Sequence, residues 1–204
     1  GRAVPSPMGI MMLLIAWSVK IVAFGSEEGA ISAKKMYENA KVNLKKNRGY
    51  LKNEKIRIIW WDIPLGFYNI HPWLEEEFGA VTVADLIGRA QYTCIDTSSE
   101  ESMISGLSRA QLNVSMARHM RGPFEFVTDE FQQIIEEFSG DCVIFSQHVG
   151  CTHKYASAKI LRDMCREAGL PALFLNTDIF DKRQASEHQI KKEITNFFRN
   201  SGLA

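Results

Sequence analysis

Four short apolar runs along the chain predict β-strands. Each is rich in branched and aromatic residues, and none alternates cleanly between apolar and polar positions. The runs are KIRIIWWD (55–62), AVTVAD (80–85), CVIFSQ (142–147) and ALFLN (172–176). Because a strand that is covered on both faces is apolar throughout, these runs indicate a parallel sheet lying between two layers of helices.

Apolar residues at helical spacing predict helices between and after these strands. We expect one from Pro72 to Phe78, one from Phe124 to Phe138, one from about Lys154 to Ala168, and a last one opened by Ser186 and Gln189 at the spacing of a capping box. Strands that alternate with helices predict an α/β protein with a doubly wound, mainly parallel four-stranded sheet of the flavodoxin-like or Rossmann-like kind. Residues 87–122 contain two short helical patterns and no convincing strand, which predicts an excursion between the second and third strands.

The first 50 residues form a separate region in this interpretation. Residues 1–50 are expected to be a helical lead-in that packs on an α/β domain of residues 51–204. The stretch Met8–Gly25 is strongly apolar, but Lys20 interrupts it and it is shorter than the roughly 20 residues that span a bilayer. It therefore predicts a buried helix and no membrane anchor. The first residue, Gly1, suggests a trimmed chain or a piece of a longer protein, not expected to be active alone.

Composition narrows the classes of function. Lys plus Arg and Asp plus Glu number 24 each, so no net charge attracts nucleic acid or anionic lipid. The four cysteines form no C-x-x-C pair and no secreted disulfide pattern, which favours a reduced, cytoplasmic protein. The chain also lacks a dinucleotide-binding G-x-G-x-x-G, a Walker phosphate loop and a G-x-S-x-G nucleophile elbow.

Candidate chemistry gathers after the strands, because ligands of open parallel sheets bind at the carboxyl ends of the strands. Cys151 follows the third strand and precedes a helix, whose N-terminus favours an anion such as a thiolate. A small residue packed in a turn is the other interpretation, and both stay open. His148 and His153 flank this cysteine and are candidates for contact with substrate. Phe67 and Tyr68, after the first strand, are candidates for lining an apolar pocket.

The other polar and sulfur-containing residues are expected to have structural roles. Cys142 begins an apolar strand and Cys165 lies on the apolar face of a helix, so both are predicted to be core residues. Cys94 is also predicted to pack. Asp178, Asp181 and Arg183 follow the fourth strand and are placed to reach a site, but an internal Asp–Arg pair that shapes the loop is favoured.

Residues 140–198 resemble the C-terminal end of subunits of the 2-hydroxyacyl-CoA dehydratase family, which includes the ATP-dependent benzoyl-CoA reductases. The features that carry the resemblance are a D-C-V-I-F strand, a lone cysteine after it, a helix ending in G-L-P, a D-x-R-x-x-S-x-x-Q pattern and a final pair of phenylalanines. Residues 56–85 resemble, more loosely, the preceding strand-helix-strand unit of that family.

The resemblance implies a heterodimer with a second dehydratase subunit, an ATP-dependent activator protein and a 4Fe-4S cluster held by three cysteines. One electron would reach the thioester carbonyl of an acyl-CoA and form a ketyl radical, from which the 2-hydroxyl leaves. In the reductase branch the electron would enter an aromatic ring. By position Cys151 matches the last cysteine ligand, whereas Cys94, Cys142 and Cys165 match neither of the others. The ligand set is thus expected to be incomplete in this chain.

Three hypotheses follow. In the first, the chain is the C-terminal domain of a dehydratase-type or reductase-type subunit and Cys151 is one cluster ligand. In the second, it is a non-catalytic scaffold or subunit-interaction domain without a cluster. In the third, it is a thiol enzyme that uses Cys151 with His148 or His153.

Overall fold

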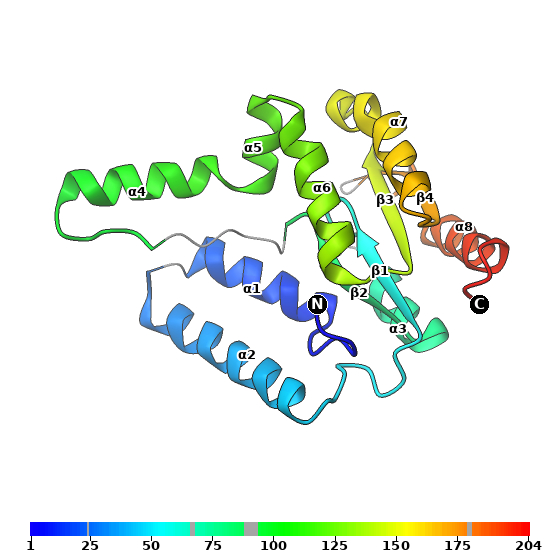
Figure 1. The fold of residues 1–204 in the computed structure, drawn as a ribbon, viewed down its shortest axis with the longest axis horizontal. Coiled ribbons are helices and arrows are strands. Elements are labelled where there is room, and N and C mark those ends of the chain that lie inside the picture. The colour runs from blue at the N-terminus through cyan, green and yellow to red at the C-terminus, as the bar shows by residue number, and fades with distance from the viewer. Residues whose placement is uncertain (24, 66–67, 88–93, 179–180) are drawn as a thin grey trace.

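The computed structural model describes residues 1–23, 25–65, 68–87, 94–178 and 181–204. Four strands form one parallel sheet in the order β2-β1-β3-β4: β1 (Ile56–Trp60), β2 (Ala80–Asp85), β3 (Cys142–His148) and β4 (Ala172–Thr177). The helices are α1 (Ile10–Val22), α2 (Glu27–Lys45), α3 (Ile70–Phe78), α4 (Glu100–Leu112), α5 (Ser115–Arg121), α6 (Glu125–Phe138), α7 (Thr152–Glu167) and α8 (Glu187–Asn200) (Figure 1).

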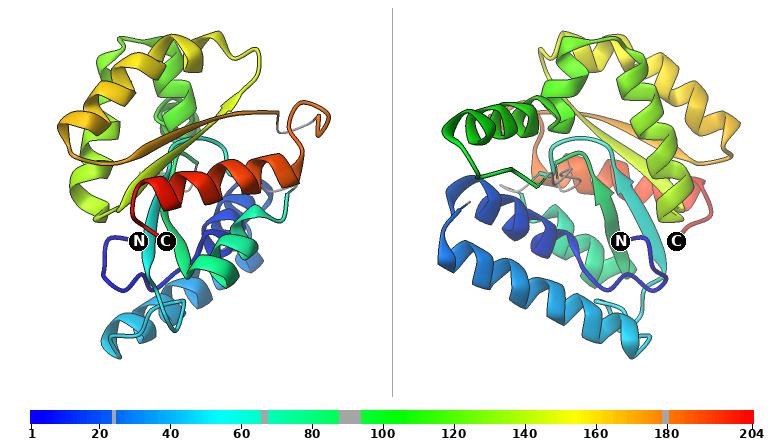
Figure 2. Two further views of the ribbon diagram at one scale, coloured as in Figure 1. Left: turned by 90° about the vertical axis from the view of Figure 1, so that its right-hand side faces the viewer. Right: turned by 60° about the vertical axis from the view of Figure 1, so that its left-hand side comes forward.

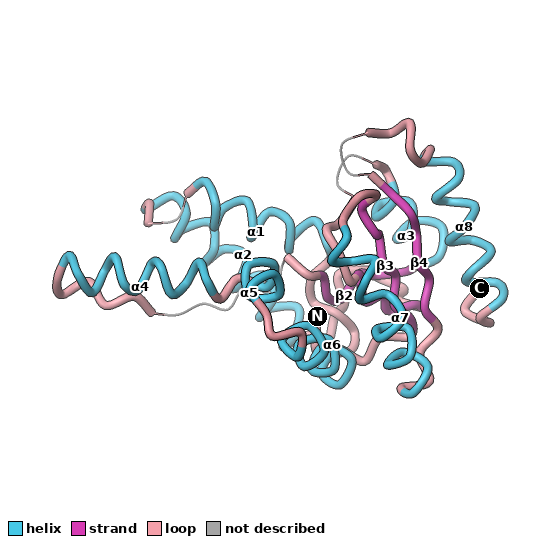
Figure 3. The backbone as a smooth tube through the Cα atoms, turned by 90° about the horizontal axis from the view of Figure 1, so that it is seen from above, coloured by secondary structure: helices cyan, strands magenta, loops and turns pink. Residues whose placement is uncertain are grey.

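The sheet is covered on both faces, which confirms the doubly wound α/β prediction. Helices α3 and α8 lie on one side of the strands, and α6 and α7 lie on the other (Figure 3). In β1, Ile56, Ile58 and Trp60 pack toward the first layer, while Ile59 and Trp61 at its end pack toward the second. Both sets are buried because alternate residues of a strand point to opposite faces. This is why apolar residues occupy successive positions of the strands instead of every second one.

The ends of the helices follow from local chemistry. Gly79 ends α3 with φ of +61°, and a Cβ there would lie 2.6 Å from the carbonyl oxygen of Asn53, so only glycine fits. At the start of α8 the Ser186 hydroxyl accepts a hydrogen bond from the Gln189 amide at 3.1 Å. The Gln189 side chain instead donates to Glu193, so the predicted capping box at this helix is only half correct.

Helices α1 and α2 run side by side along the β2 edge of the sheet (Figure 2). The prediction that the apolar N-terminal helix is buried is wrong, because in α1 only Ile10 is buried. Its exposed large apolar side chains are Met11, Ile15, Ile21 and Val22. The helix is apolar around its circumference, but α2 and β2 cover only part of it. Within the described ranges, no helix has the length and apolar content needed to cross a bilayer.

The segment between β2 and β3 is the predicted excursion, with helices and no strand in its described residues. It forms α4 and α5 before the chain returns through α6. Helix α4 has no buried residue and projects away from the sheet (Figure 1). Cys94 lies in the segment that leads into α4 and is exposed, so the prediction that it packs is wrong. Cys142 and Cys165 are buried as predicted, and burial raises the pKa of the Cys165 thiol to about 12.

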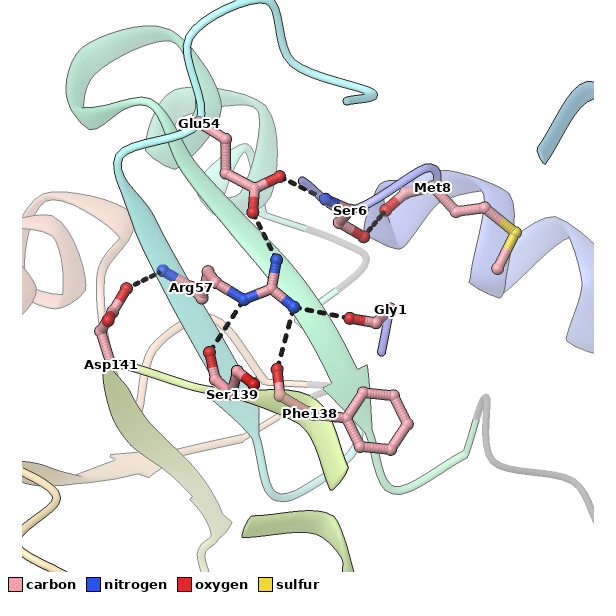
Figure 4. Close-up of polar contacts among 8 residues, drawn as sticks. All are labelled: Gly1, Ser6, Met8, Glu54, Arg57, Phe138, Ser139 and Asp141. Atoms are coloured by element: carbon pink, nitrogen blue, oxygen red, sulfur yellow. Dashed lines mark hydrogen bonds and ion pairs between the residues drawn. The ribbon is translucent and has the colours of Figure 1, made fainter. Parts of the chain in front are cut away.

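A buried arginine joins the N-terminal segment to the sheet (Figure 4). The guanidinium of Arg57 in β1 pairs with Glu54 and donates to the carbonyl oxygens of Ser139 at 2.8 Å, Phe138 at 2.9 Å and Gly1 at 2.6 Å. Glu54 also accepts a hydrogen bond from the Ser6 amide at 2.7 Å. A buried charge is stabilised only when it is paired and hydrogen-bonded. The Arg57 guanidinium therefore depends on all of these partners together.

Replacing Arg57 by Met should lower the free energy of unfolding by about 3–5 kcal/mol, because Glu54 would remain buried without its partner. Urea denaturation at pH 7 measures the change. Arg183→Met is the control, since the Arg183 side chain is 90% exposed and solvent screens its ion pair with Asp181, so the free energy of unfolding should change little. Equal losses in the two variants would contradict the assigned role of Arg57.

Folding should also depend on pH through His71, which is buried in α3 next to Thr82 and Trp60. Burial lowers the pKa of His71 from 6.5 to about 4. Between these values the unfolded chain binds a proton that the folded chain does not. The contribution of His71 to the free energy of unfolding is therefore fully present above pH 6.5. It falls by about 3 kcal/mol as the pH drops toward 4.

His71→Leu should therefore flatten the dependence of unfolding free energy on pH between 4 and 6.5. Chemical denaturation at several pH values in that window tests this, with His188→Leu at an exposed position as the control. An unchanged slope in His71→Leu would show that other groups cause the acid sensitivity.

Candidate functional site

The sheet changes its direction of winding between β1 and β3. From β1 the chain passes through α3 to β2 on one side, and from β3 it passes through α7 to β4 on the other. Helices α3 and α7 also lie on opposite faces. The loop after β1 therefore leads to one face of the sheet, and the loop after β3 leads to the other. In open α/β sheets this arrangement at the carboxyl edge is where ligands bind.

Buried hydrogen bonds hold the loop after β1 against β3. The Trp61 amide donates to the Ile144 carbonyl at 2.9 Å. The Trp60 indole donates to the Ser146 hydroxyl at 2.8 Å, and that hydroxyl donates to the Ile63 carbonyl at 3.1 Å. The buried Ser146 thus links a strand side chain to the backbone of the loop. This fixes the residues that follow β1 relative to those that follow β3.

Asp62 and Lys154 face each other across the junction of β1 and β3. Lys154 lies in the first turn of α7, and its Nζ is 3.8 Å from Asp62 Oδ1 and 5.8 Å from the centre of the Trp61 ring. Burial raises the pKa of Asp62, although the charge of Lys154 and a hydrogen bond from the Ile63 amide act in the opposite direction. Among the described residues, none donates a hydrogen bond to Asp62 Oδ2.

Cys151 is the N-cap residue of α7. Its amide donates to the His148 carbonyl at 3.0 Å, and its side chain makes no capping hydrogen bond. Gly150 before it has φ of +87°, the left-handed conformation that allows the tight turn from β3 into α7. The thiol is half-buried, at a helix N-terminus whose first turn carries no acidic residue. Such an environment favours negative charge.

The two histidines lie on either side of this turn. His148 is the last residue of β3, and its Nδ1 is 3.7 Å from Asp178 Oδ1 at the end of β4. His153 is in the first turn of α7, with its ring 6.5 Å from the Phe124 ring. Burial, together with the neighbouring charges of Lys154 and His119, lowers the pKa of His153. Both histidines therefore belong to the carboxyl edge.

Of the two aromatic residues after β1 that were candidates for lining a pocket, the structure describes Tyr68. Tyr68 is buried, and its hydroxyl donates toward the carbonyl oxygens of Asp178 at 3.2 Å and Ala185 at 3.3 Å. It thereby connects the loop after β1 to the loop after β4. Phe67 lies outside the described residues. The predicted Asp–Arg pair after β4 is present and is formed by Asp181 and Arg183, with Nη2 of the arginine 2.7 Å from Oδ2 of the aspartate.

A buried polar cluster that the sequence analysis did not find lies beside Trp61. Glu130 of α6 accepts hydrogen bonds from Ser115 at 2.6 Å and His119 at 3.0 Å, and pairs with Arg118 at 3.2 Å. The His119 ring lies 5.8 Å from that of Trp61. Burial opposes ionisation of Glu130, but the hydrogen bonds from His119 and Ser115 outweigh it and lower its pKa. This cluster docks α5 on α6 next to the site.

Two apolar hollows lie away from Cys151 and the two histidines. One of about 570 Å³ lies between the first residues, α1, α2 and β2, and one of about 630 Å³ lies between α1 and the α4–α5 junction. Cys151, His148 and His153 line neither of them. These two hollows are therefore separate from Cys151 and the two histidines, although Ser115 of the Glu130 cluster lines the second one.

The described residues do not make a complete metal site. No group of three or more His, Cys, Asp or Glu side chains has the geometry to hold a metal ion within the ranges the structure covers. Cys142 and Cys165 are buried in opposite core layers, so neither reaches the edge where Cys151 lies. Cys151 is half-buried at the N-terminus of α7, so its thiol, unlike those of Cys142 and Cys165, lies at this edge, and a thiol is the ligand type of iron–sulfur clusters.

The fold defines an α/β protein whose four-stranded parallel sheet carries the candidate residues at its carboxyl edge. The family model for the 2-hydroxyglutaryl-CoA dehydratase D-component matches residues 1–200, and the chain belongs to this family. The match includes α1 and α2, which the resemblance found in the sequence did not cover. No curated protein matches the chain closely.

The Glu130 cluster predicts a local effect on α5. Glu130→Gln should loosen α5, because Arg118 and His119 would lose a charged acceptor. Amide hydrogen exchange within residues 115–121 should accelerate about tenfold or more. Asp129→Asn, an exposed change on the same helix, is the control and should leave these rates unchanged. Unaltered exchange in Glu130→Gln would mean that other contacts dock α5.

Proposed function

We propose that this chain contributes one thiolate, that of Cys151, to a 4Fe-4S cluster of a 2-hydroxyacyl-CoA dehydratase. The family membership supports the class of reaction, and the placement of Cys151 supports the residue. The remaining ligands would come from residues other than Cys142 and Cys165, which are sealed in the core. The cluster would supply one-electron reduction of the acyl-CoA.

Each part of the site has a task in this proposal. The N-terminus of α7 stabilises the negative charge of the Cys151 thiolate. Ser146 and the Gly150 turn keep the loops after β1 and β3 in fixed positions, so the ligand is pre-positioned. His148 and His153 border the turn and would contact the substrate or orient the groups that do. Tyr68 supports the loop after β1 through its hydrogen bonds to the loop after β4.

The exposed apolar side chains support a partner subunit. Large apolar residues are exposed on α1 and on the projecting α4: Met11, Ile15, Ile21 and Val22 on the first, and Met103, Ile104, Leu107 and Leu112 on the second. Contiguous exposed apolar surface is typical of subunit interfaces. The proposed assembly is a heterodimer with a second dehydratase subunit, served by an ATP-dependent activator. A scaffold without a cluster would use the same surfaces, and a reductase would use the same ligand, so the metal and the product distinguish these alternatives.

Cys151→Ser in the complete protein, assembled anaerobically with its partner, tests the proposal. We expect loss of most of the iron and sulfide and of the visible absorption of the cluster, because a hydroxyl is a poor ligand for iron in such clusters. Cys94→Ser removes an exposed thiol and should leave the iron content unchanged. A Cys151→Ser protein with wild-type iron, sulfide and spectrum would refute the assignment. Absence of iron from the wild-type assembly would favour the scaffold.

A further inference from the structure

Lys154 is a largely buried cation next to the proposed cluster ligand. It occupies the first turn of α7, three residues after Cys151, and its side chain is only 14% exposed. The Lys154 side chain extends toward the end of β1, where its ammonium lies near Asp62 and over the Trp61 ring. Lysine is seldom buried to this extent unless its charge is compensated.

The compensation that the described residues give Lys154 is incomplete. Its Nζ is 3.8 Å from Asp62 Oδ1, beyond the distance of a hydrogen bond. The Asp62 side chain is 6% exposed, and its Oδ2 accepts no hydrogen bond from the described residues. The Trp61 ring adds a cation–π contact to the ammonium. Attraction to Asp62 and Trp61 therefore fixes where the ammonium lies without using its hydrogen-bond donors.

Two sources of positive potential act together at this place. The first is the ammonium of Lys154, and the second is the N-terminus of the 16-residue α7, which has no acidic residue in its first turn. A negatively charged or strongly polarised oxygen is the ligand group that such a potential favours.

We propose that Lys154 binds the thioester carbonyl oxygen of the acyl-CoA substrate, and that Asp62 and Trp61 position it. This rests on the proposed function, because the family is the reason to expect a CoA thioester. The carbonyl is the electron-withdrawing group of a 2-hydroxyacyl thioester, so negative charge accumulates on its oxygen when electrons enter the acyl group. A preorganised cation beside that oxygen stabilises this charge without reorganisation during the reaction.

Binding of two CoA derivatives to the complete assembled protein tests the role of Lys154. The probes are 2-hydroxyglutaryl-CoA and the matching thioether, in which CH₂ replaces the thioester carbonyl. The wild-type protein should bind the thioester more tightly. Lys154→Met should weaken thioester binding about tenfold or more and leave thioether binding unchanged, as expected for a hydrogen bond from a charged donor. Lys154→Arg, which retains the charge, should keep most of the preference.

Further variants separate this role from a structural one. Asp62→Asn should reduce the thioester preference by less than Lys154→Met does, because it displaces the ammonium without removing it. Lys159→Met, exposed on the same helix, should bind both probes as the wild type does. Equal weakening of both probes in Lys154→Met, or a wild-type protein without preference between them, would overturn the inference. Iron content measured in parallel distinguishes the failures: an iron-free wild type refutes the proposed function, whereas an iron-loaded protein without preference refutes only the role of Lys154.

Discussion

The hydrogen-bonded junction between β1 and β3 is the constraint on which the site depends. Two parallel strands share an edge there, and the loops that follow them diverge to opposite faces of the sheet. The Ser146 hydroxyl accepts from Trp60 and donates to the Ile63 carbonyl, so it satisfies buried polar groups of both β1 and its loop. Unpaired polar groups in this interior would be costly, which makes the geometry of the junction close to obligatory.

Several charged side chains are buried near the junction. Asp62 and Lys154 lie on opposite sides of it, and Glu130 with its three donors lies behind Trp61. Each group is held by at least one packed aromatic ring or a defined hydrogen bond. Because low-dielectric surroundings strengthen electrostatic interactions, these buried groups interact with one another more strongly than exposed charges at the same distances would.

The elements that were predicted well are those whose residues satisfy a local rule. The four strands are apolar at consecutive positions, and α6 and α8 carry apolar residues at helical spacing, so their existence followed from periodicity. The failures have a common physical cause, namely that burial depends on distant partners. Four large apolar side chains of α1 and the thiol of Cys94 are exposed because α2 and β2 cover only part of α1 and no described segment packs over Cys94.

The same division applies to the site. The sequence by itself determined the sheet, the order of its elements and the position of Cys151 between a strand and a helix, because all of these depend on neighbours along the chain. Only the tertiary structure decided that Asp62 faces Lys154, 92 positions away, and that Glu130 collects Ser115, Arg118 and His119 beside Trp61. No local sequence pattern predicts these contacts. They arise from the packing of helices against a twisted sheet and from the burial of charge that this packing imposes.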